Sequence, residues 1–461
     1  MSRPKKLIVA IIDGLTPSMF EAAVGGDTAP WLTFLAEHGA YRRATSVFPS
    51  LTPVCLSSIA TGAFPDVHEI PHLVWYHRGE QRLVEYGSSF GAVRAAGTRQ
   101  SLSDTVYNLN AEHLGLGATT LYEAVEDAGL VPAAVNITCY RGRTTHLPTV
   151  PIVTRPARGP KRFFFYNLFE SDVTGARLAV RNRPGGTIDA YAAQVGRWLV
   201  TRDGFDVLVY YLSDYDYASH SHGPDAAHAA LARSDAQIGA LVEAAGGREQ
   251  FLDRYALILL ADHGQTAVTD VASLGERLDV PGVLVTASNR AGMIYRLEGC
   301  REEPAELARR LDGVAAAEVV LWREGGEAVA RREGEELRFR RDGDGFELSG
   351  DASILDHPNA VERCWAALAN PNAGELLVSA AVGWEFADLG GRHHVGGGSH
   401  GSLTTGDSEV PMLTVGVDAD PTSIVDVMPA ALRHLGIEPP GYTLPPFRRR
   451  LVGAATPAVG S

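Results

Sequence analysis

The 461-residue sequence contains only four cysteines, which lie far apart and form no C-x-x-C pair. Such sparse thiols exclude a disulfide framework and a thiolate metal site, and they indicate reduced structural cysteines in a reducing compartment. No apolar run approaches the ~20 residues of a membrane-spanning helix. The run Leu7–Ile12 is too short for the apolar core of a secretion signal. We therefore expect a cytoplasmic protein.

The sequence also lacks an excess of positive charge. Its 41 lysines and arginines stand against 55 aspartates and glutamates, which gives a formal net charge of −14. An acidic protein of this kind has no general electrostatic attraction for nucleic acid or for anionic membranes, so no nucleic-acid polymer is expected as a partner. Hydrophobic residues make up 45% of the chain, which is typical of a globular protein. A phosphate-bearing substrate would have to be attracted locally, for example by bound metal cations.

Short apolar runs alternate with amphipathic segments along most of the chain. Capping residues, apolar spacing and a closing glycine indicate helices in three segments, 119–129, 224–247 and 422–436. The sequence therefore predicts an α/β fold with a mostly parallel central sheet flanked by helices. The predicted buried strands, rich in Leu and β-branched residues, are Leu7–Ile12, Val207–Leu212, Tyr255–Leu260 and Met412–Val417.

Two segments interrupt this alternation. Residues 74–117 are rich in Gly and Ser and show no clear periodicity, so they are predicted to form a long loop or cap near the site. Residues 287–391 include charged stretches of alternating character, such as Arg331–Arg341, which are typical of a hairpin or an antiparallel edge. We expect them to form a small inserted α+β lobe. The core would then comprise residues 1–286 and 392–451, followed by a flexible tail at 452–461.

Potential metal ligands follow three of the predicted strands. Open α/β sheets bind their ligands at the carboxyl ends of the strands, so these groups are expected to converge at one edge of the sheet. Singly, each has an ordinary alternative, such as an Asp that starts a helix beside an unrelated His. The groups are Asp13 after the first run, Asp216 and His220 in a D-x-x-x-H pattern after the second, and Asp262-His263 after the third.

Two further residues could act together with these ligands, one as an additional metal ligand and one as a nucleophile. His400 lies in a Gly-Ser-His-Gly loop before the last predicted strand, and Thr52 precedes Pro53. Alone, such a histidine is usually exposed and such a threonine usually forms a turn or cap. Carboxylate and imidazole ligands suit Zn²⁺ and, less exclusively, Mn²⁺ or Fe. Two such ions about 4 Å apart can clamp the attacking and leaving oxygens of phosphoryl transfer, and a metal can activate a threonine hydroxyl.

The order and spacing of these residues resemble the alkaline phosphatase superfamily, and within it the type I phosphodiesterase/nucleotide pyrophosphatase branch. The matching pieces extend from Leu7 to beyond His400. The stretch from Thr52 to His68 follows the family pattern T-x₇-A-T-G-x-x-P-x-x-H without a gap. The resemblance implies an alkaline phosphatase-like fold, two divalent metal ions, and Thr52 as a nucleophile that forms a phosphothreonine. One ion would be held by Asp13, Thr52, Asp262 and His263, and the other by Asp216, His220 and His400.

The sequence departs from the family pattern at positions that bear on the substrate. Pro53-Val54-Cys55 stands where the branch carries Phe-Pro-Asn, and Leu73 stands where its diesterases place an Asn that contacts a phosphate oxygen. The metal site is therefore better supported than a preference for diesters. His393 and His394 are expected to be bystanders. Candidate substrate contacts are His72, Trp75 and Tyr76, for which packing in the cap is the alternative, and Arg141 and Arg143, for which surface salt bridges are the alternative.

These features predict a metal-dependent hydrolase of the phosphodiesterase/nucleotide pyrophosphatase type, acting on a small phosphate-ester or nucleotide-like substrate. The first alternative is a phosphomonoesterase or phosphonate hydrolase on the same scaffold. The second is a non-catalytic, metal-stabilised binding protein, against which the complete set of ligands and the nucleophile argue. A sulfatase is disfavoured, because Cys55 lacks the C-x-P-x-R context that such enzymes need.

Overall fold

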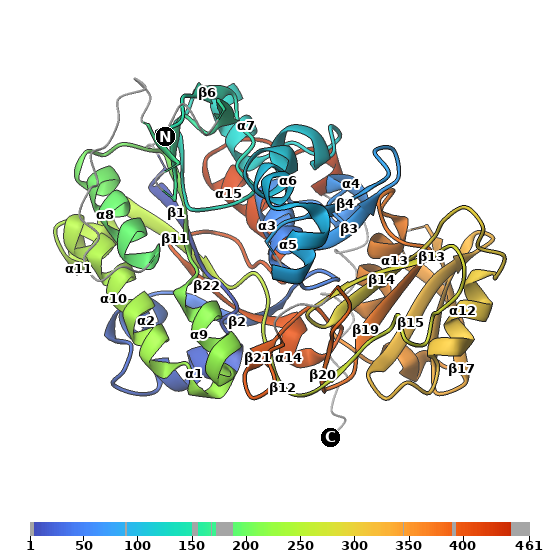
Figure 1. The fold of residues 1–461 in the computed structure, drawn as a ribbon. Helices are drawn as coiled ribbons and strands as arrows, with labels where there is room; N and C mark the ends of the chain where they lie inside the picture. Colours follow the sequence, from blue (N-terminus) through green and yellow to red (C-terminus); the bar gives the residue numbers. More distant parts are fainter. Residues whose placement is uncertain are drawn as a thin grey trace.

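The structure, a computed structural model, describes residues 4–87, 90–149, 155–166, 168–171, 188–343, 345–389 and 393–443. Two β-sheets lie side by side, and the second is formed by the segment between residues 283 and 380 (Figure 1). None of the helices in the described ranges combines the length and the apolar character needed to cross a membrane.

Eight strands form the first sheet, in the order β2-β22-β11-β1-β10-β5-β8-β9. Its centre is parallel, because β1 pairs in parallel with both β10 and β11, β10 with β5, and β5 with β8. β10 and β11 are buried along their whole length, as expected for strands covered on both faces. The strands are β1 (Lys6–Ile12), β2 (Ala40–Thr45), β5 (Pro132–Val135), β8 (Arg162–Phe165), β9 (Phe169–Ser171), β10 (Val207–Leu212), β11 (Tyr255–Leu260) and β22 (Glu409–Val415).

The predicted mostly parallel character is not confirmed, because the sheet is mixed. The predicted strand at Met412–Val417 corresponds to β22, which runs antiparallel to both β11 and β2. β9 likewise runs antiparallel to β8. The path of the chain explains the direction of β22. The chain enters it from α14 (Thr405–Ser408), which lies beside the carboxyl end of β11, where Gly264 N–H donates to the Asp407 carbonyl at 2.9 Å.

Helices form in all three segments for which the sequence predicts them. Thr120 caps α7 (Leu121–Asp127) in a capping box with Glu123. α10 (His228–Ala244) and α15 (Val427–His434) each follow a short 3₁₀ turn, so each begins later than its capping residues suggest. In Figure 1, α8 (Ile188–Thr201), α10 and α11 (Arg248–Arg254) lie on one side of the first sheet, and α3 (Thr52–Thr61), α7 and α15 on the other.

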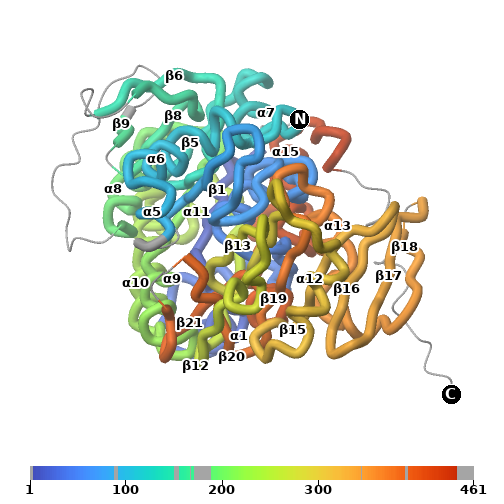
Figure 2. The backbone as a smooth tube through the Cα atoms, turned by 45° about the vertical axis from the view of Figure 1, so that its right-hand side comes forward, coloured from blue at the N-terminus to red at the C-terminus, as the bar shows by residue number. Residues whose placement is uncertain are grey.

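The second sheet is antiparallel throughout and has the order β13-β14-β19-β15-β16-β17-β18. It begins at Val283, ahead of the predicted boundary at 287, and Arg331 pairs with Glu336 in its β16–β17 hairpin. Figure 2 shows β17 and β18 at its outer edge. The strands are β13 (Val283–Ser288), β14 (Ala291–Arg296), β15 (Ala317–Glu324), β16 (Glu327–Arg332), β17 (Glu335–Asp342), β18 (Gly345–Gly350) and β19 (Leu376–Ala380), accompanied by α12 (Pro304–Leu311) and α13 (Ala360–Ala369).

Most of the segment 74–117 has regular secondary structure. It starts with a hairpin of β3 (Val74–His77) and β4 (Arg82–Glu85). The helices α5 (Phe90–Ala96) and α6 (Thr98–Ser103) follow, and a π-helix, η1 (Asp104–His113), continues from α6. In a π-helix the hydrogen bonds span five residues instead of four. A hairpin and helices thus take the place of most of the long loop that was one of the two predictions for this segment.

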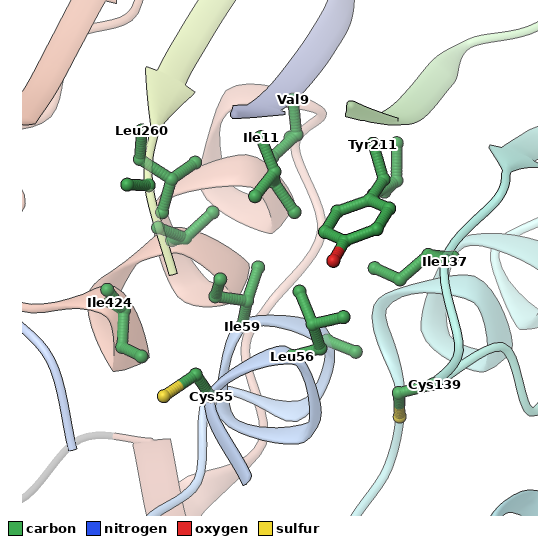
Figure 3. Close-up of a cluster of buried hydrophobic side chains, with 14 of the residues drawn as sticks. Val9, Ile11, Cys55, Leu56, Ile59, Ile137, Cys139, Tyr211, Leu260 and Ile424 are labelled. Carbon is green, nitrogen blue, oxygen red and sulfur yellow. The ribbon is translucent and has the colours of Figure 1, made fainter. Parts of the chain in front are cut away.

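Helix α3 carries Thr52 as its first residue and is buried almost all round. All its residues from Pro53 to Thr61 are buried. Figure 3 shows Leu56 and Ile59 of α3 directed toward Ile11 of β1, with Tyr211 of β10 beside them. A helix without a polar face can be stable only inside the core. Packing on all sides therefore fixes the position of the helix end that presents Thr52.

A buried carboxylate in α10 is expected to make stability depend on pH. Asp235 accepts hydrogen bonds from Trp31 N–H at 3.1 Å and Leu32 N–H at 2.7 Å, at the start of α2 (Pro30–Glu37). Burial raises the pKa of Asp235 to about 6. A raised pKa means that the folded chain binds the proton more tightly, so this contribution to stability is present below pH ~4 and is lost as the pH rises through 6.

Asp235→Asn should therefore gain stability relative to the wild type as the pH rises from 4.5 to 7.5, by at most about 3 kcal/mol. The asparagine keeps an oxygen that can accept the bond from Leu32. Urea unfolding of both proteins at the two pH values measures the difference. A difference in unfolding free energy that does not change with pH would contradict the assignment.

Candidate active site

Five chain segments bring the predicted ligands together at the carboxyl ends of the parallel strands. Asp13 directly follows β1, and Asp262 and His263 directly follow β11. Asp216 and His220 lie in α9 (Asp214–His222), which begins two residues after β10 ends. The other two segments are the start of α3, with Thr52, and the loop after β21 (Gly398–Ser399), with His400.

The first cluster surrounds the ring of His263. Its Nε2 lies 3.1 Å from Thr52 Oγ1, 3.4 Å from Asp13 Oδ1 and 3.5 Å from Asp262 Oδ2. Neither of these two carboxylate oxygens has a hydrogen-bond partner among the described residues, although both are buried. Their other oxygens are satisfied, since Tyr211 O–H donates to Asp13 Oδ2 and Gly14 N–H donates to Asp262 Oδ1 at 3.2 Å. Two buried, unpartnered carboxylate oxygens beside one imidazole form a set to which a cation fits.

The second cluster adjoins the first. Asp216 Oδ2 lies 3.3 Å from His220 Nε2, and its Oδ1 accepts a hydrogen bond from the Gln265 amide. The ring of His400 stacks on that of His263, with ring centroids 3.6 Å apart and planes 9° from parallel. The potential ligand atoms of Asp216, His263 and His400 lie within 4.8 Å of one another, as do those of Asp13, Asp262 and His263.

All three imidazoles are oriented in the same way. In each ring Nδ1 faces a backbone carbonyl, which can only accept a hydrogen bond, so Nδ1 carries the proton and Nε2 can offer its lone pair to a metal or to a hydrogen-bond donor. Histidines that bind metals are oriented in this manner by a hydrogen bond on the other ring nitrogen. The carbonyls are those of Gly264 at 3.1 Å from His263, Gly398 at 2.8 Å from His220, and Ser50 at 2.8 Å from His400.

Glycines permit the close backbone approaches around these rings. A Cβ on Gly264 would lie 2.1 Å from the Gly406 carbonyl oxygen, and one on Gly397 would lie 2.1 Å from that of His220. Real Cβ atoms essentially never come so close. The glycine after Asp262-His263 and those before His400 are therefore needed for the chain to reach the site.

The pKa values of the buried carboxylates reflect the negative charge that is concentrated at the site. Burial, together with the charges of Asp216 and Asp262, raises the pKa of Asp13 well above its usual value. Burial also raises the pKa of Asp262. For Asp216 burial is the largest single effect and would raise the pKa, but the neighbouring His220, His400 and His263 together lower it. Burying three carboxylates together is costly unless positive charge accompanies them. Carboxylate and imidazole ligands are the donor set that suits Zn²⁺, Mn²⁺ or Fe.

A cavity of about 740 Å³ opens onto both clusters. Its far wall is formed by apolar and aromatic side chains from the cap and from the β8–β9 region. No lysine or arginine is found among the described residues that line it. The lining residues of this wall are Leu73, Tyr86, Leu102, Val106, Leu109, Phe165, Tyr166 and Leu168, with Tyr211 and Tyr217 nearer the metal-ligand side.

None of the five predicted substrate contacts lines this cavity. His72 and Trp75 are fully buried, and Tyr76 packs edge-on against Tyr295. Arg141 donates to the Leu114 carbonyl at 2.9 Å and is paired with Glu123, which also pairs with Arg143. These contacts correspond to the alternatives raised from the sequence, which were packing within the cap for the first three residues and salt bridges for the two arginines.

Three residues that the sequence reasoning passed over lie at the site. Asn289 lines the cavity, with its Nδ2 3.2 Å from His400 Nε2. Gln265 binds Asp216, and its position directly after Asp262-His263-Gly264 could have drawn notice. His394, expected to be a bystander, lines the cavity and stacks on His220 with ring centroids 4.2 Å apart. Nothing in the sequence around Asn289 indicates its position.

A buried arginine joins the second sheet to the His400 loop. Arg290, between β13 and β14, donates from Nε to Asp407 at 2.8 Å and from Nη2 to Ser402 at 3.2 Å. Its backbone N–H donates to the His400 carbonyl at 3.0 Å. The loop that carries His400 is thus held by the turn between β13 and β14 of the second sheet.

Residues 7–403 match the model of the type I phosphodiesterase / nucleotide pyrophosphatase family. Among solved structures, murine ectonucleotide pyrophosphatase / phosphodiesterase 5 is similar with a TM-score of 0.61 and 15% identity, over 95% of this chain and 96% of that one. Phosphonoacetate hydrolase from Sinorhizobium meliloti 1021, in complex with phosphonoformate, is similar with a TM-score of 0.62 and 19% identity, over 95% and 100%. At these identities the likeness shows the fold alone. No curated protein matches the chain by sequence.

Proposed function

This chain belongs to the type I phosphodiesterase/nucleotide pyrophosphatase family, and we propose that it hydrolyses phosphodiesters through a phosphothreonine on Thr52, with two bound divalent metal ions. One observation carries the proposal: the Nε2 of His263, whose ring is anchored through Nδ1, lies 3.1 Å from Thr52 Oγ1 beside two unpartnered carboxylate oxygens. The rings of His220 and His400 in the adjoining cluster are anchored through Nδ1 in the same way. The proposed ligands are Asp13, Thr52, Asp262 and His263 for one ion, and Asp216, His220 and His400 for the other.

The ions, when bound, would lower the pKa of the Thr52 hydroxyl and of water and would offset charge on the attacking and leaving oxygens. Thr52 Oγ1 loses its proton to water and forms a bond to phosphorus while the bond from phosphorus to the leaving oxygen breaks, and the leaving oxygen takes up a proton from water. Water next cleaves the phosphothreonine and releases a phosphomonoester. Thr52 begins α3, whose N-terminal end carries a partial positive charge that favours the phosphoryl group there.

The amide of Asn289 is proposed to contact the substrate phosphate. Leu73 stands where the family's diesterases carry an asparagine, and its side chain cannot donate a hydrogen bond. Asn289 lies on the cavity beside His400 and offers an amide N–H group instead. This residue comes from a different part of the chain, so it would replace the family contact without sharing its sequence position.

The cavity favours a singly charged diester that carries a bulky apolar or aromatic group. Aromatic side chains such as Tyr86, Phe165 and Tyr166 could pack against such a group. An inactive variant of the murine neighbour was solved in complex with AMP, whose base is a group of this kind. A phosphonate hydrolase is the second candidate, since the bacterial neighbour was also solved in complex with phosphonoacetate. That substrate carries an additional carboxylate, and no lysine or arginine on the described cavity lining would pair with it.

Three substrates distinguish the candidates: bis(4-nitrophenyl) phosphate, 4-nitrophenyl phosphate and phosphonoacetate. We expect kcat/KM for the diester to exceed that for the other two by at least about tenfold, or about 1.4 kcal/mol in transition-state stabilisation. The reason is that the monoester and the phosphonate bring a second negative charge into a cavity whose described lining residues include no lysine or arginine. A higher kcat/KM for phosphonoacetate would establish the second candidate, and no turnover of any of the three by the metal-loaded protein would favour a binding protein.

The cysteines support a cytoplasmic location for this activity. All four are free, and Cys55, Cys139 and Cys364 are buried. Unpaired cysteines are typical of proteins from reducing compartments.

A further inference from the structure

A second group of potential metal ligands lies in the cap, apart from the Thr52 site. Glu80 is in the turn between β3 and β4, and Glu112 and His113 end the π-helix η1. The potential ligand atoms of these three side chains lie within 4.8 Å of one another. None of the three residues lines the cavity that contains Thr52.

His113 has the features of a metal-binding histidine. Its side chain is buried, with the residue only 3% exposed, and its Nδ1 is hydrogen-bonded to the Tyr86 hydroxyl at 2.8 Å. Its Nε2 is buried and has no partner among the described residues. Leaving such an atom unsatisfied costs free energy, and a bond to a cation would remove that cost. As in known sites, one ring nitrogen fixes the ring and leaves the other for the metal.

A second histidine lies next to this group. The backbone N–H of Glu80 donates to Nδ1 of His77 at 3.0 Å, so the proton of the neutral His77 ring is on Nε2. That Nε2 lies 3.8 Å from Glu80 Oε1, and the His77 and His113 ring centroids are 6.1 Å apart. His77 therefore packs beside the group and is not one of its ligands in this orientation.

The nearby positive charges are offset by other partners. Arg82 contacts the other oxygen of Glu80, but its guanidinium also forms a two-bond pair with Asp104 at 2.7 and 3.1 Å. Arg155 reaches Glu112 only at 4.0 Å and lies over the Tyr107 ring. The carboxylates of Glu80 and Glu112 therefore keep charge that a cation can neutralise.

We propose that Glu80, Glu112 and His113 bind a third divalent metal ion of the Zn²⁺ class, with water completing its coordination. Mixed carboxylate and imidazole ligands suit this class. The ion joins the turn of the β3–β4 hairpin to the end of η1.

Such an ion would stabilise the apolar wall of the catalytic cavity. Thr105, Val106 and Leu109 of η1 line that cavity, and so does Tyr86, which holds the His113 ring. Hairpin, π-helix and Tyr86 would be tied together at one point, on the side of the wall away from the substrate. The role of this ion is structural and is independent of the chemistry at Thr52.

Metal content of the full-length protein tests the proposal. The protein is loaded with Zn²⁺, freed of unbound metal and measured by mass spectrometry of the elements. We expect the double variant Glu80→Gln/Glu112→Gln to contain one equivalent less than the wild type. The matched control Glu276→Gln/Glu298→Gln, which removes two acidic groups elsewhere, should contain as much as the wild type. His113→Gln, alone or added to the double variant, should lose the same single equivalent and no more.

Thermal unfolding provides a second measurement on the same proteins. Added Zn²⁺ should raise the unfolding midpoint of the wild type and the control further than that of the double variant, because the third ion binds only the folded cap. Equal metal content in the wild type and in Glu80→Gln/Glu112→Gln would overturn the proposal. Loss of an equivalent from the control as well would also overturn it, since it would indicate unspecific binding to surface carboxylates.

Discussion

Replacing Thr52 with alanine is expected to lower kcat for a phosphodiester by at least about 10³-fold, or roughly 4 kcal/mol in activation free energy. The hydroxyl is the group that would form the covalent bond to phosphorus, and its Oγ1 lies 3.1 Å from His263 Nε2 at the centre of the ligand cluster. The carboxylates and imidazoles are unchanged by the substitution. Metal content should therefore stay close to that of the wild type, as elemental analysis would check.

Thr105→Ala is the matched control. Thr105 lines the same cavity, but its hydroxyl donates to the Ser101 carbonyl at 2.8 Å within the cap and does not contact the ligand cluster. The same chemical change there should leave kcat nearly unchanged. Thr52→Ser keeps a hydroxyl and should retain part of the activity, and acid quenching should trap a phosphorylated residue 52 in this variant and in the wild type. Full activity of Thr52→Ala would refute the nucleophile assignment.

The second large effect is expected for Asp216→Asn, which should lower both the metal content and the rate. Asp216 Oδ2 lies 3.3 Å from His220 Nε2, while its other oxygen is held by Gln265. The substitution removes the negative charge from the second cluster but keeps the shape of the side chain. We expect loss of about one equivalent of metal and a fall in kcat/KM of about 10²-fold or more, or roughly 3 kcal/mol.

Added metal separates this effect from that of Thr52→Ala. Excess Zn²⁺ should restore part of the rate of Asp216→Asn, because the defect lies in affinity for the ion, whereas it should not restore Thr52→Ala. Asp225→Asn, a change of an exposed aspartate just after α9, serves as the control and should behave as the wild type. Wild-type metal content in Asp216→Asn would contradict the proposed ligand set.

The sequence predicted the convergence of the ligands better than the cavity around them. Asp13 and Asp262 follow buried strands, and strand ends in a parallel sheet share one edge, so their proximity could be inferred from local patterns. The direction of β22 was harder to predict, because an apolar run has the same composition whether the strand is parallel or antiparallel. The direction depends on the path of the chain through α14, and the residues of the strand do not reflect that path.

The cavity wall lay beyond sequence reasoning for a physical reason. Thr105, Val106 and Leu109 of the π-helix η1 line it from one part of the chain, and the aromatic residues Phe165 and Tyr166 face it from a distant part. Asn289 had been placed in a separate inserted lobe, although it contacts His400. Contacts between segments far apart in sequence carry no local pattern, so only the fold reveals them.

The buried Arg290 has a consequence for how this protein could diversify. Arg290 joins the start of the second sheet to the His400 loop. β13 and β14 therefore support the candidate active site and should tolerate few substitutions. Among the described residues of β17 and β18, at the outer edge of that sheet, no such link to the His400 loop is found, so these strands are expected to accept insertions more readily. One end of the second sheet would then be constrained by the candidate site, while the other end is free to vary.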